Sequence, residues 1–205
     1  MPTPLSYTSH SAPKIIPYTD EWTRARIGKI TGSEVHLILG SEAQRLNYLG
    51  LLISEILTGQ VKTFSSKPTD TGIAREEMAI SLYKFEYQPV RPSEFITKGD
   101  HLACTPDGFI DDGIIEVKSP YQPVNHFMCF LKGMPKKHYP QLQFNMWITD
   151  SHVCDFVSYS PDAHASKQLY VEPVYIDYPY IEKMKAKIDK FISELDSLLD
   201  IMLTE

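Results

Sequence analysis

The chain has 205 residues, a length typical of one domain or at most two small ones. Hydrophobic residues make up 42% and charged residues 22%, a globular mixture that argues against intrinsic disorder, and no apolar run approaches the roughly 20 residues of a membrane-spanning helix. The formal net charge of −6 and the pI of about 5.6 predict, taken alone, a protein that nucleic acid would repel.

The cysteines and the N-terminus indicate the compartment. Cys104, Cys129 and Cys154 are odd in number and widely spaced, which is the pattern of neither a disulfide framework nor a zinc site. The first residues contain no apolar core of the signal-peptide type. We therefore expect a cytoplasmic protein without membrane association, in which residues 1–205 form a single domain.

The N-terminal half predicts an arm followed by helices. Residues 1–20 are rich in Pro, Ser and Thr and predict an extended arm. Thr31 and Glu34 have the spacing of a capping box, with Thr31 as the N-cap of a short helix that stops at Gly40. Two longer helices with a polar loop between them follow. The helices are predicted over residues 42–57 and 73–87, and the loop over residues 62–71.

From residue 94 the pattern changes to short β-branched and aromatic runs divided by turn residues. The first four runs predict an antiparallel meander, and two later strands complete the sheet. The predicted strands cover residues 94–97, 101–105, 108–110, 113–118, 152–159 and 171–177.

The last third of the chain returns to helices. A linker rich in Pro and Tyr leads to residue 132, and a helix is predicted from about Tyr139. Residues 181–202 have the apolar spacing of a long amphipathic helix. Helices packed on the faces of a central sheet predict an α/β or α+β fold with one core.

The most informative stretch places two acidic residues and a lysine on one predicted hairpin. Asp107 lies at a strand start, and Glu116 and Lys118 lie two residues apart on the returning strand, so that their side chains leave the same face. Val117 then points into the core. Carboxylates from adjacent strands can share Mg²⁺, and a lysine beside them can orient water or offset charge on a phosphate. These groups predict phosphodiester hydrolysis, and an exposed ion pair on a surface hairpin is the alternative.

Glu76 supplies a further acidic group. In the predicted helix 73–87 it is followed at the third and fourth positions by Ala79 and Ile80, which places it on the apolar side. An unpaired carboxylate there is costly, so Glu76 is expected to turn inward to a metal or a partner, while Glu77 faces solvent. An ordinary surface glutamate is the alternative.

Five motifs in chain order resemble one nuclease family. They are Trp22-x3-Arg26 with Thr31-x-Ser33-Glu34, Gly72-x3-Glu76, Pro106-Asp107-Gly108, Glu116-Val117-Lys118, and Gln141-Leu142-Gln143-x2-Met146-Trp147. Together they are similar to the lambda exonuclease, or YqaJ-type viral recombinase, branch of the PD-(D/E)xK nucleases. The resemblance implies an α/β fold of the restriction-endonuclease type, with a mixed central β-sheet flanked by helices.

The resemblance also implies an activity. It implies a Mg²⁺-dependent exonuclease, which Mn²⁺ also supports, that degrades one strand of a linear DNA duplex from its 5′ end. The remaining 3′ overhang would serve a single-strand annealing recombinase. The enzyme would form a homotrimeric ring around DNA, in a bacterial cell that hosts a phage or prophage.

The same resemblance assigns roles to individual residues. Those expected to hold the metal or act in catalysis are Asp107, Glu116, Lys118, Glu76, Gln141 and the Val117 carbonyl. Those expected to contact the 5′-phosphate and the DNA are Arg26, Ser33, Thr31 and Thr105. Independently of the family, a helix that begins near Gly32 would offer free N–H groups and a positive dipole end to an anion.

The chain departs from the family pattern in three places. Thr105 stands where a relative has serine, a change that keeps the hydroxyl. The family's further arginine after the lysine is missing, and Asn125 and His126 are the candidate replacements. The apolar wedge that relatives use to split the end base pair has no clear counterpart near Thr69.

Two other functions fit the same residues. An endonuclease, or a repair nuclease of different polarity, would keep the fold and the metal site. A catalytically silent DNA-binding recombination scaffold would keep the fold alone.

The distribution of charge weakens the argument against DNA. Residues 191–205 contain four acidic residues and no basic one, and residues 105–120 contain four acidic residues and one lysine. The rest of the chain is close to neutral. Because residues 105–120 include the expected metal ligands, a bound cation would offset their charge where a phosphate must lie.

Overall fold

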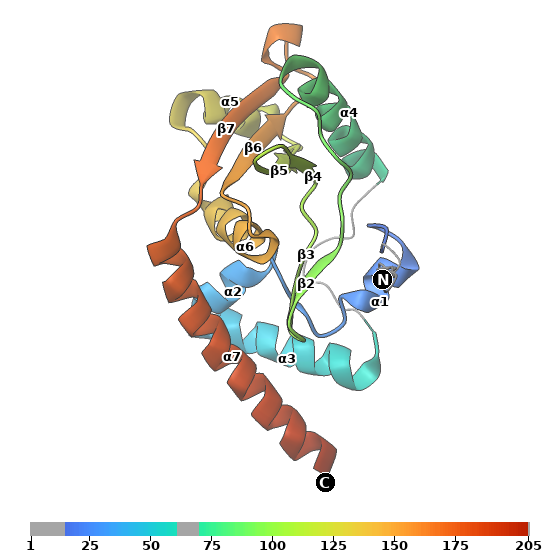
Figure 1. The fold of residues 1–205 in the computed structure, drawn as a ribbon, viewed down its shortest axis with the longest axis vertical. Helices are drawn as coiled ribbons and strands as arrows, with labels where there is room; N and C mark the ends of the chain where they lie inside the picture. Colours follow the sequence, from blue (N-terminus) through green and yellow to red (C-terminus); the bar gives the residue numbers. More distant parts are fainter. Residues whose placement is uncertain (1–14, 61–69, 205) are drawn as a thin grey trace, which may run out of the picture.

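The computed structural model describes residues 15–60 and 70–204 (Figure 1). In chain order its elements are α1 (Asp20–Ala25), β1 (Ile30–Thr31), α2 (Val35–Leu39), α3 (Glu42–Thr58), α4 (Asp70–Glu86), β2 (Ile96–Lys98), β3 (Leu102–Cys104), β4 (Gly108–Ile110), β5 (Gly113–Lys118), α5 (Pro123–Lys132), the 3₁₀ turn η1 (Lys136–His138), α6 (Tyr139–Thr149), β6 (Val153–Tyr159), the 3₁₀ turn η2 (Ala165–Lys167), β7 (Leu169–Tyr175) and α7 (Tyr178–Thr204).

Within the described ranges the strands form two sheets, where the sequence predicted one. The order is β1-β3-β2 in the smaller sheet and β4-β5-β6-β7 in the larger. The predicted meander is therefore wrong, because its two hairpins, β2–β3 and β4–β5, belong to different sheets. Pro106 lies between them, and a proline cannot donate a ladder hydrogen bond.

The larger sheet is mixed and covered by helices on both faces. Strands β5 and β6 are parallel, and the pairs on either side are antiparallel. Along β5 the side chains alternate: Ile115 and Val117 pack with residues of α4, and Ile114 packs with residues of α5 and α6. This is the restriction-endonuclease-like core that the sequence predicted, and Val117 points into it as expected.

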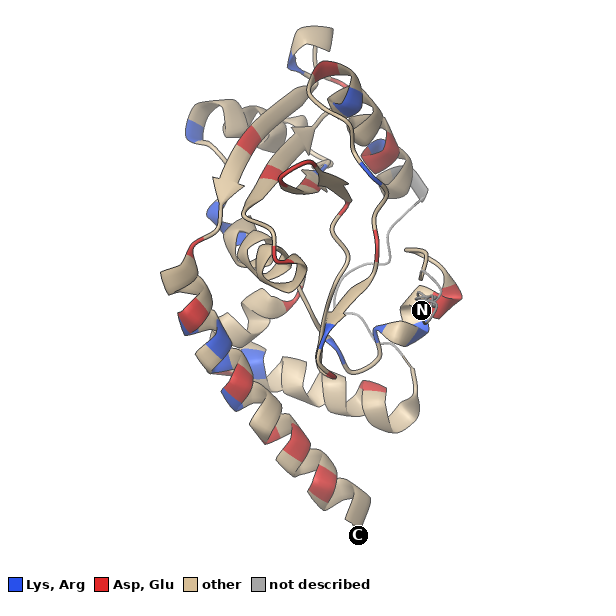
Figure 2. Cartoon of the chain, viewed as in Figure 1, with Lys and Arg blue, Asp and Glu red and all other residues tan. Residues whose placement is uncertain are grey.

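A second apolar cluster lies between α2, α3, α6 and α7. Tyr48 of α3 stacks on Phe191 of α7 with a ring-centroid distance of 5.7 Å. The predicted amphipathic helix 181–202 is confirmed as α7, which is slightly longer. Its acidic C-terminal half extends away from the sheets (Figures 1 and 2). No helix of the described residues is both long and apolar enough to cross a bilayer.

Three local predictions need correction. Thr31 is not an N-cap, because it belongs to β1 and the N-cap of α2 is Glu34. The predicted linker before residue 132 is helix α5, whose first turn accommodates Pro123 because that position needs no N–H partner. The arm ends before Asp20, where α1 begins, and residues 1–14 and most of the predicted loop lie outside the described residues.

The close contact of β5 with β6 gives a test of the fold. A Cβ added at Gly113 would lie 2.0 Å from the Val153 carbonyl oxygen, so Gly113→Ala has to push the two strands apart. We expect it to lower the free energy of unfolding by about 1–3 kcal/mol in urea denaturation. Gly50→Ala is the control, because a Cβ there meets nothing within 4 Å on α3, and we expect it to raise stability by about 1 kcal/mol. A Gly113→Ala variant as stable as the wild type would contradict the strand pairing.

Candidate functional site

Asp107 and Glu116 lie opposite each other at the open end of the β4–β5 hairpin. The register pairs Gly108 with Ile115, and the Asp107 N–H donates to the Ile115 carbonyl at 3.1 Å. Directly opposed residues of an antiparallel pair share one face of the sheet. The Asp107 carboxylate also accepts a hydrogen bond of 2.6 Å from the Val117 N–H, which fixes it against the end of β5.

Glu116 is a buried carboxylate held by three donors. Its side chain is 2% exposed. Lys118 Nζ and Gln141 Nε2 each lie 2.5 Å from Oε1, and Asn145 Nδ2 donates to Oε2 at 3.1 Å. Strand β5 supplies the lysine and α6 supplies both amides. The prediction that Glu116 and Lys118 share a face is confirmed, and Gln141 lies beside them as expected.

Glu76 turns inward from α4. Its side chain is half-buried, whereas Glu77 is exposed, so the predicted orientation of both glutamates is confirmed. The hydroxyl of Tyr18 donates to Glu76 Oε2 at 3.0 Å. Burial raises the pKa of the Glu76 carboxyl, this hydrogen bond lowers it, and the nearby charge of Glu116 raises it further.

The acidic groups repel one another across this small region. Burial raises the pKa of Asp107 well above its ordinary range, and the charges of Glu116 and Glu76 add to the rise. Burial alone would lower the pKa of Lys118, but the negative charges of Glu116 and Asp107 outweigh it, and the net shift is upward. A cation placed between the carboxylates would relieve the repulsion that burial strengthens.

The oxygen atoms around Asp107 and Glu116 fit a hard cation that takes only a few ligands from the protein. Among the described residues no three Asp, Glu, His or Cys side chains converge closely enough to hold one ion. Mg²⁺ nevertheless accepts one or two carboxylates and keeps several waters. Asp107, Glu116 and a main-chain carbonyl such as that of Val117 therefore suffice, with Glu76 nearby to accept from a water.

Two buried side-chain atoms lack hydrogen-bond partners, and one of them belongs to a residue that contacts Glu116. They are Ser119 Oγ and Asn145 Oδ1, and the part of the chain that the structure describes has no other buried side-chain nitrogen or oxygen without a hydrogen bond. Ser119 follows Lys118 directly, and Asn145 binds Glu116. Because unsatisfied buried groups are rare, the unpaired Asn145 Oδ1 beside the Glu116 carboxylate indicates a place where water or a ligand completes the structure.

The residues expected to bind a 5′-phosphate form two groups. The Arg26 guanidinium lies 4.3 Å from the ring centroid of Trp22, and Trp22 Nε1 donates to Thr105 Oγ1 at 3.0 Å. Ser33 is exposed, whereas Thr31 is buried and lies within hydrogen-bonding distance of both Ser33 and Glu34. Thr31 therefore supports its loop instead of presenting its hydroxyl to solvent.

The helix-terminus argument for this loop is corrected. The helix expected to begin near Gly32 begins at Val35 and has only five residues, so Ser33 precedes it. Gly32 instead lets the backbone of this loop lie against the Asn145 side chain, because a Cβ at position 32 would lie 2.1 Å from Asn145 Oδ1. The loop that carries Ser33 thus packs directly on the amide that binds Glu116.

One candidate replacement for the missing arginine is excluded. His126 is fully buried on α5, where its ring nitrogens lie 2.9 Å from Ser158 Oγ and 2.7 Å from the Lys167 carbonyl. It holds α5 on the sheet and cannot reach a phosphate. Asn125 is exposed and stays a candidate, and Thr69 lies outside the described residues.

Comparison with known families decides the family of the chain. Residues 21–152, more than half of the sequence, match the model of the YqaJ-like viral recombinase domain. The chain belongs to the YqaJ-like viral recombinase family.

Solved structures agree with this assignment. LHK-Exo, an alkaline exonuclease from Laribacter hongkongensis, is 29% identical with a TM-score of 0.84 over 91% of this chain and 97% of that chain. The LHK-Exo complex with dAMP is 30% identical with a TM-score of 0.83, over 90% and 96% of the two chains. A phage-related exonuclease from Haemophilus somnus 129PT shares the fold, at 20% identity and a TM-score of 0.66 over 85% and 96%. No curated protein matches the sequence.

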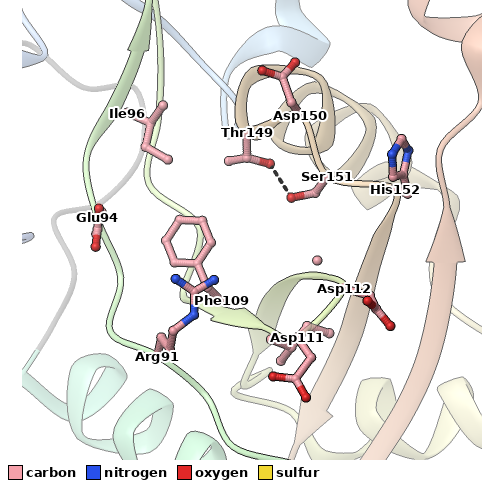
Figure 3. Close-up of a pocket in the computed structure, with 12 residues that line it drawn as sticks. Arg91, Glu94, Ile96, Phe109, Asp111, Asp112, Thr149, Asp150, Ser151 and His152 are labelled. Atoms are coloured by element: carbon pink, nitrogen blue, oxygen red, sulfur yellow. Dashed lines mark hydrogen bonds between the residues drawn. The ribbon is translucent and has the colours of Figure 1, made fainter.

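A cavity of about 460 Å³ in this YqaJ-like domain lies away from the acidic cluster. It opens at the β4–β5 turn, the opposite end of the hairpin from Asp107 and Glu116, and extends to His152 (Figure 3). The Arg91 guanidinium lies over the Phe109 ring at 5.4 Å in its wall. The carboxylates drawn there point in different directions, so the cavity does not reproduce the arrangement around Glu116 (Figure 3).

Two residues of the site were missed from the sequence of this YqaJ-like protein. Asn145 lies four positions after Gln141, so both amides fall on one face of α6, and this helical spacing was a usable signal. Tyr18 lies in the segment predicted to be an extended arm, and nothing in its neighbours indicated a contact with Glu76.

The crowding of like charges gives a prediction on stability. Asp107→Asn removes one buried charge and keeps an oxygen that can accept from the Val117 N–H. In EDTA at pH 8 we expect this variant to unfold with a free energy about 1–2 kcal/mol higher than the wild type in urea. Asp112→Asn, an exposed neighbour on the same hairpin, is the control and should change stability little. An Asp107→Asn variant less stable than the wild type would show that the carboxylates do not repel one another.

Proposed function

We propose that this chain is a divalent-metal-dependent exodeoxyribonuclease that degrades one strand of linear duplex DNA from its 5′ end. The observation that carries the proposal is the Asp107–Glu116–Lys118 cluster, in which a buried carboxylate is held by a lysine and two amides at the end of one hairpin. Membership of the YqaJ-like viral recombinase family and the likeness to the alkaline exonuclease LHK-Exo support the same conclusion.

In this mechanism Asp107, Glu116 and the Val117 carbonyl would hold Mg²⁺ or Mn²⁺, and Glu76 would be a further ligand of the ion or of its water. Bound there, the ion would polarise the phosphate and ease the deprotonation of water. Lys118 keeps its proton because the adjacent carboxylates raise its pKa, so its ammonium group can orient the attacking water and offset charge on the phosphate. Gln141 and Asn145 hold the Glu116 carboxylate in one orientation.

Arg26, Ser33 and Thr105 receive the 5′-phosphate of the DNA end, and Thr31 supports the loop that carries Ser33. The Arg26 guanidinium has no carboxylate partner within residues 15–60 and 70–204, and it can present a fork to a phosphate. Helix α1 carries Asp20 and Glu21 in its first turn, and the basic Arg24 and Arg26 lie at its C-terminal end (Figure 2). The dAMP bound in the LHK-Exo structure supports mononucleotides as products.

The proposed assembly is a homotrimeric ring of single nuclease domains that span residues 1–205. The 3′ overhangs it leaves would be passed to a single-strand annealing recombinase, as the family name suggests. Exposed apolar side chains on α5 and at the end of α7 provide surface for contacts between chains. They include Val124, Phe127, Leu131, Ile201 and Leu203.

The function is tested with linear duplexes that carry a label at the 5′ or at the 3′ end, and with closed circles. We expect the wild type with Mg²⁺ to release 5′-labelled mononucleotides first and to leave circles intact. Lys118→Ala should slow release at least about 100-fold at equal folding, because the charge on the phosphate is no longer offset. Lys187→Ala, an exposed lysine of α7, is the matched control and should retain wild-type activity.

Each alternative predicts a different result in this assay. Cutting of circles would indicate an endonuclease, and earlier release of the 3′ label would indicate the opposite polarity. Binding of the duplex without release of nucleotides in Mg²⁺ or Mn²⁺ would indicate a catalytically silent scaffold. Wild-type activity in Lys118→Ala would refute the role of the cluster.

A further inference from the structure

Tyr18 adopts an unfavourable backbone conformation beside the proposed nuclease centre. Its φ is 66°, in the left-handed region that bulky residues avoid. Asp150 is the other residue besides glycine with positive φ within the described ranges, and it caps the C-terminus of α6, where this conformation is common. Tyr18 follows Pro17 in the turn before α1, a place where positive φ is usual for glycine and costs a bulky residue energy.

The side chain of Tyr18 connects two parts of the site. Its hydroxyl donates to Glu76 Oε2 at 3.0 Å, and its ring lies 5.4 Å from the ring of Trp22. Trp22 in turn donates a hydrogen bond to Thr105, and its ring lies under the guanidinium group of Arg26. The segment before α1 thereby links the carboxylate on α4 to the residues proposed to receive the phosphate.

The hydrogen bond from Tyr18 keeps the Glu76 carboxylate in place next to other acidic groups. Glu76 is half-buried and feels the like charges of Glu116 and Glu77. A long glutamate side chain near the start of a helix can rotate away from such neighbours toward solvent. A donor at 3.0 Å, on a ring already held by Trp22, opposes that rotation.

We propose that Tyr18 is a positioning residue, whose hydroxyl fixes the Glu76 carboxylate toward the metal side of the centre. This inference rests on the proposed function. Loss of the hydroxyl therefore weakens metal binding and leaves the stability of the fold unchanged.

The test compares Tyr18→Phe with the wild type in two measurements. The first is the Mg²⁺ concentration that gives half-maximal nuclease activity, and the second is the Kd for Mn²⁺ from calorimetry without DNA. We expect Tyr18→Phe to raise both about three- to tenfold, which is the range for the loss of one typical intramolecular hydrogen bond. The midpoint of thermal unfolding should not change. Tyr175→Phe, an exposed tyrosine of β7, is the control and should alter neither quantity.

A second variant separates the hydroxyl from the ring and the backbone. Tyr18→Gly removes the side chain and relieves the positive φ, so we expect a fold at least as stable as the wild type with the same loss of Mn²⁺ affinity. Unchanged metal dependence in Tyr18→Phe would overturn the proposal, and so would a defect confined to Tyr18→Gly. If the wild type shows no nuclease activity, the proposed function fails, and the Mn²⁺ Kd of Tyr18→Phe still decides the role of Tyr18.

Discussion

A carboxylate that is almost completely buried has to be surrounded by donors, and Glu116 imposes this requirement on the rest of the site. One partner, Lys118, lies two residues further along the same strand, and the other two, Gln141 and Asn145, lie on α6. The strand and the helix therefore have to pack at one fixed distance and register. The close approach of Gly32 to Asn145 extends the constraint to the loop that carries Ser33. One buried carboxyl side chain therefore connects β5, α6 and the β1–α2 loop.

The acidic cluster lowers the local stability of the fold. Asp107, Glu116 and Glu76 are placed where their charges disfavour one another, and burial amplifies the effect. The backbone of Tyr18 and the unpaired Oδ1 of Asn145 are further unfavourable features near the same carboxylates. Strain and unsatisfied polar groups gather at functional sites, and here they lie around the cluster that the sequence motifs predicted.

The sequence predicted correctly those features of the structure that neighbouring residues determine. The shared face of Glu116 and Lys118 follows from the two-residue period of a strand, and the inward turn of Glu76 follows from the apolar positions after it; both were confirmed. The long helix α7 followed from its spacing in the same way. Family motifs added Gln141, which no local pattern would have joined to Glu116.

The errors came where distant parts of the chain decide the structure. The division of the strands into two sheets depends on β1 and β6, which pair with β3 and β5 from far away in sequence. Thr31 has the spacing of a cap, but pairing with β3 draws it into a strand. Tyr18 meets Glu76 across 58 positions, and His126 is captured by Ser158 and Lys167, contacts that no local pattern contains.

The central claim is that Asp107 and Glu116 hold a divalent cation at the end of the β4–β5 hairpin. A crystal soaked in Mn²⁺, with anomalous scattering used to locate the ion, tests this claim most directly. The account predicts an anomalous peak at about 2.0–2.3 Å from a carboxylate oxygen of each residue, with Lys118 Nζ displaced from Glu116. Ordered Mn²⁺ elsewhere in the chain, with Lys118 and Gln141 still bonded to Glu116, would contradict it.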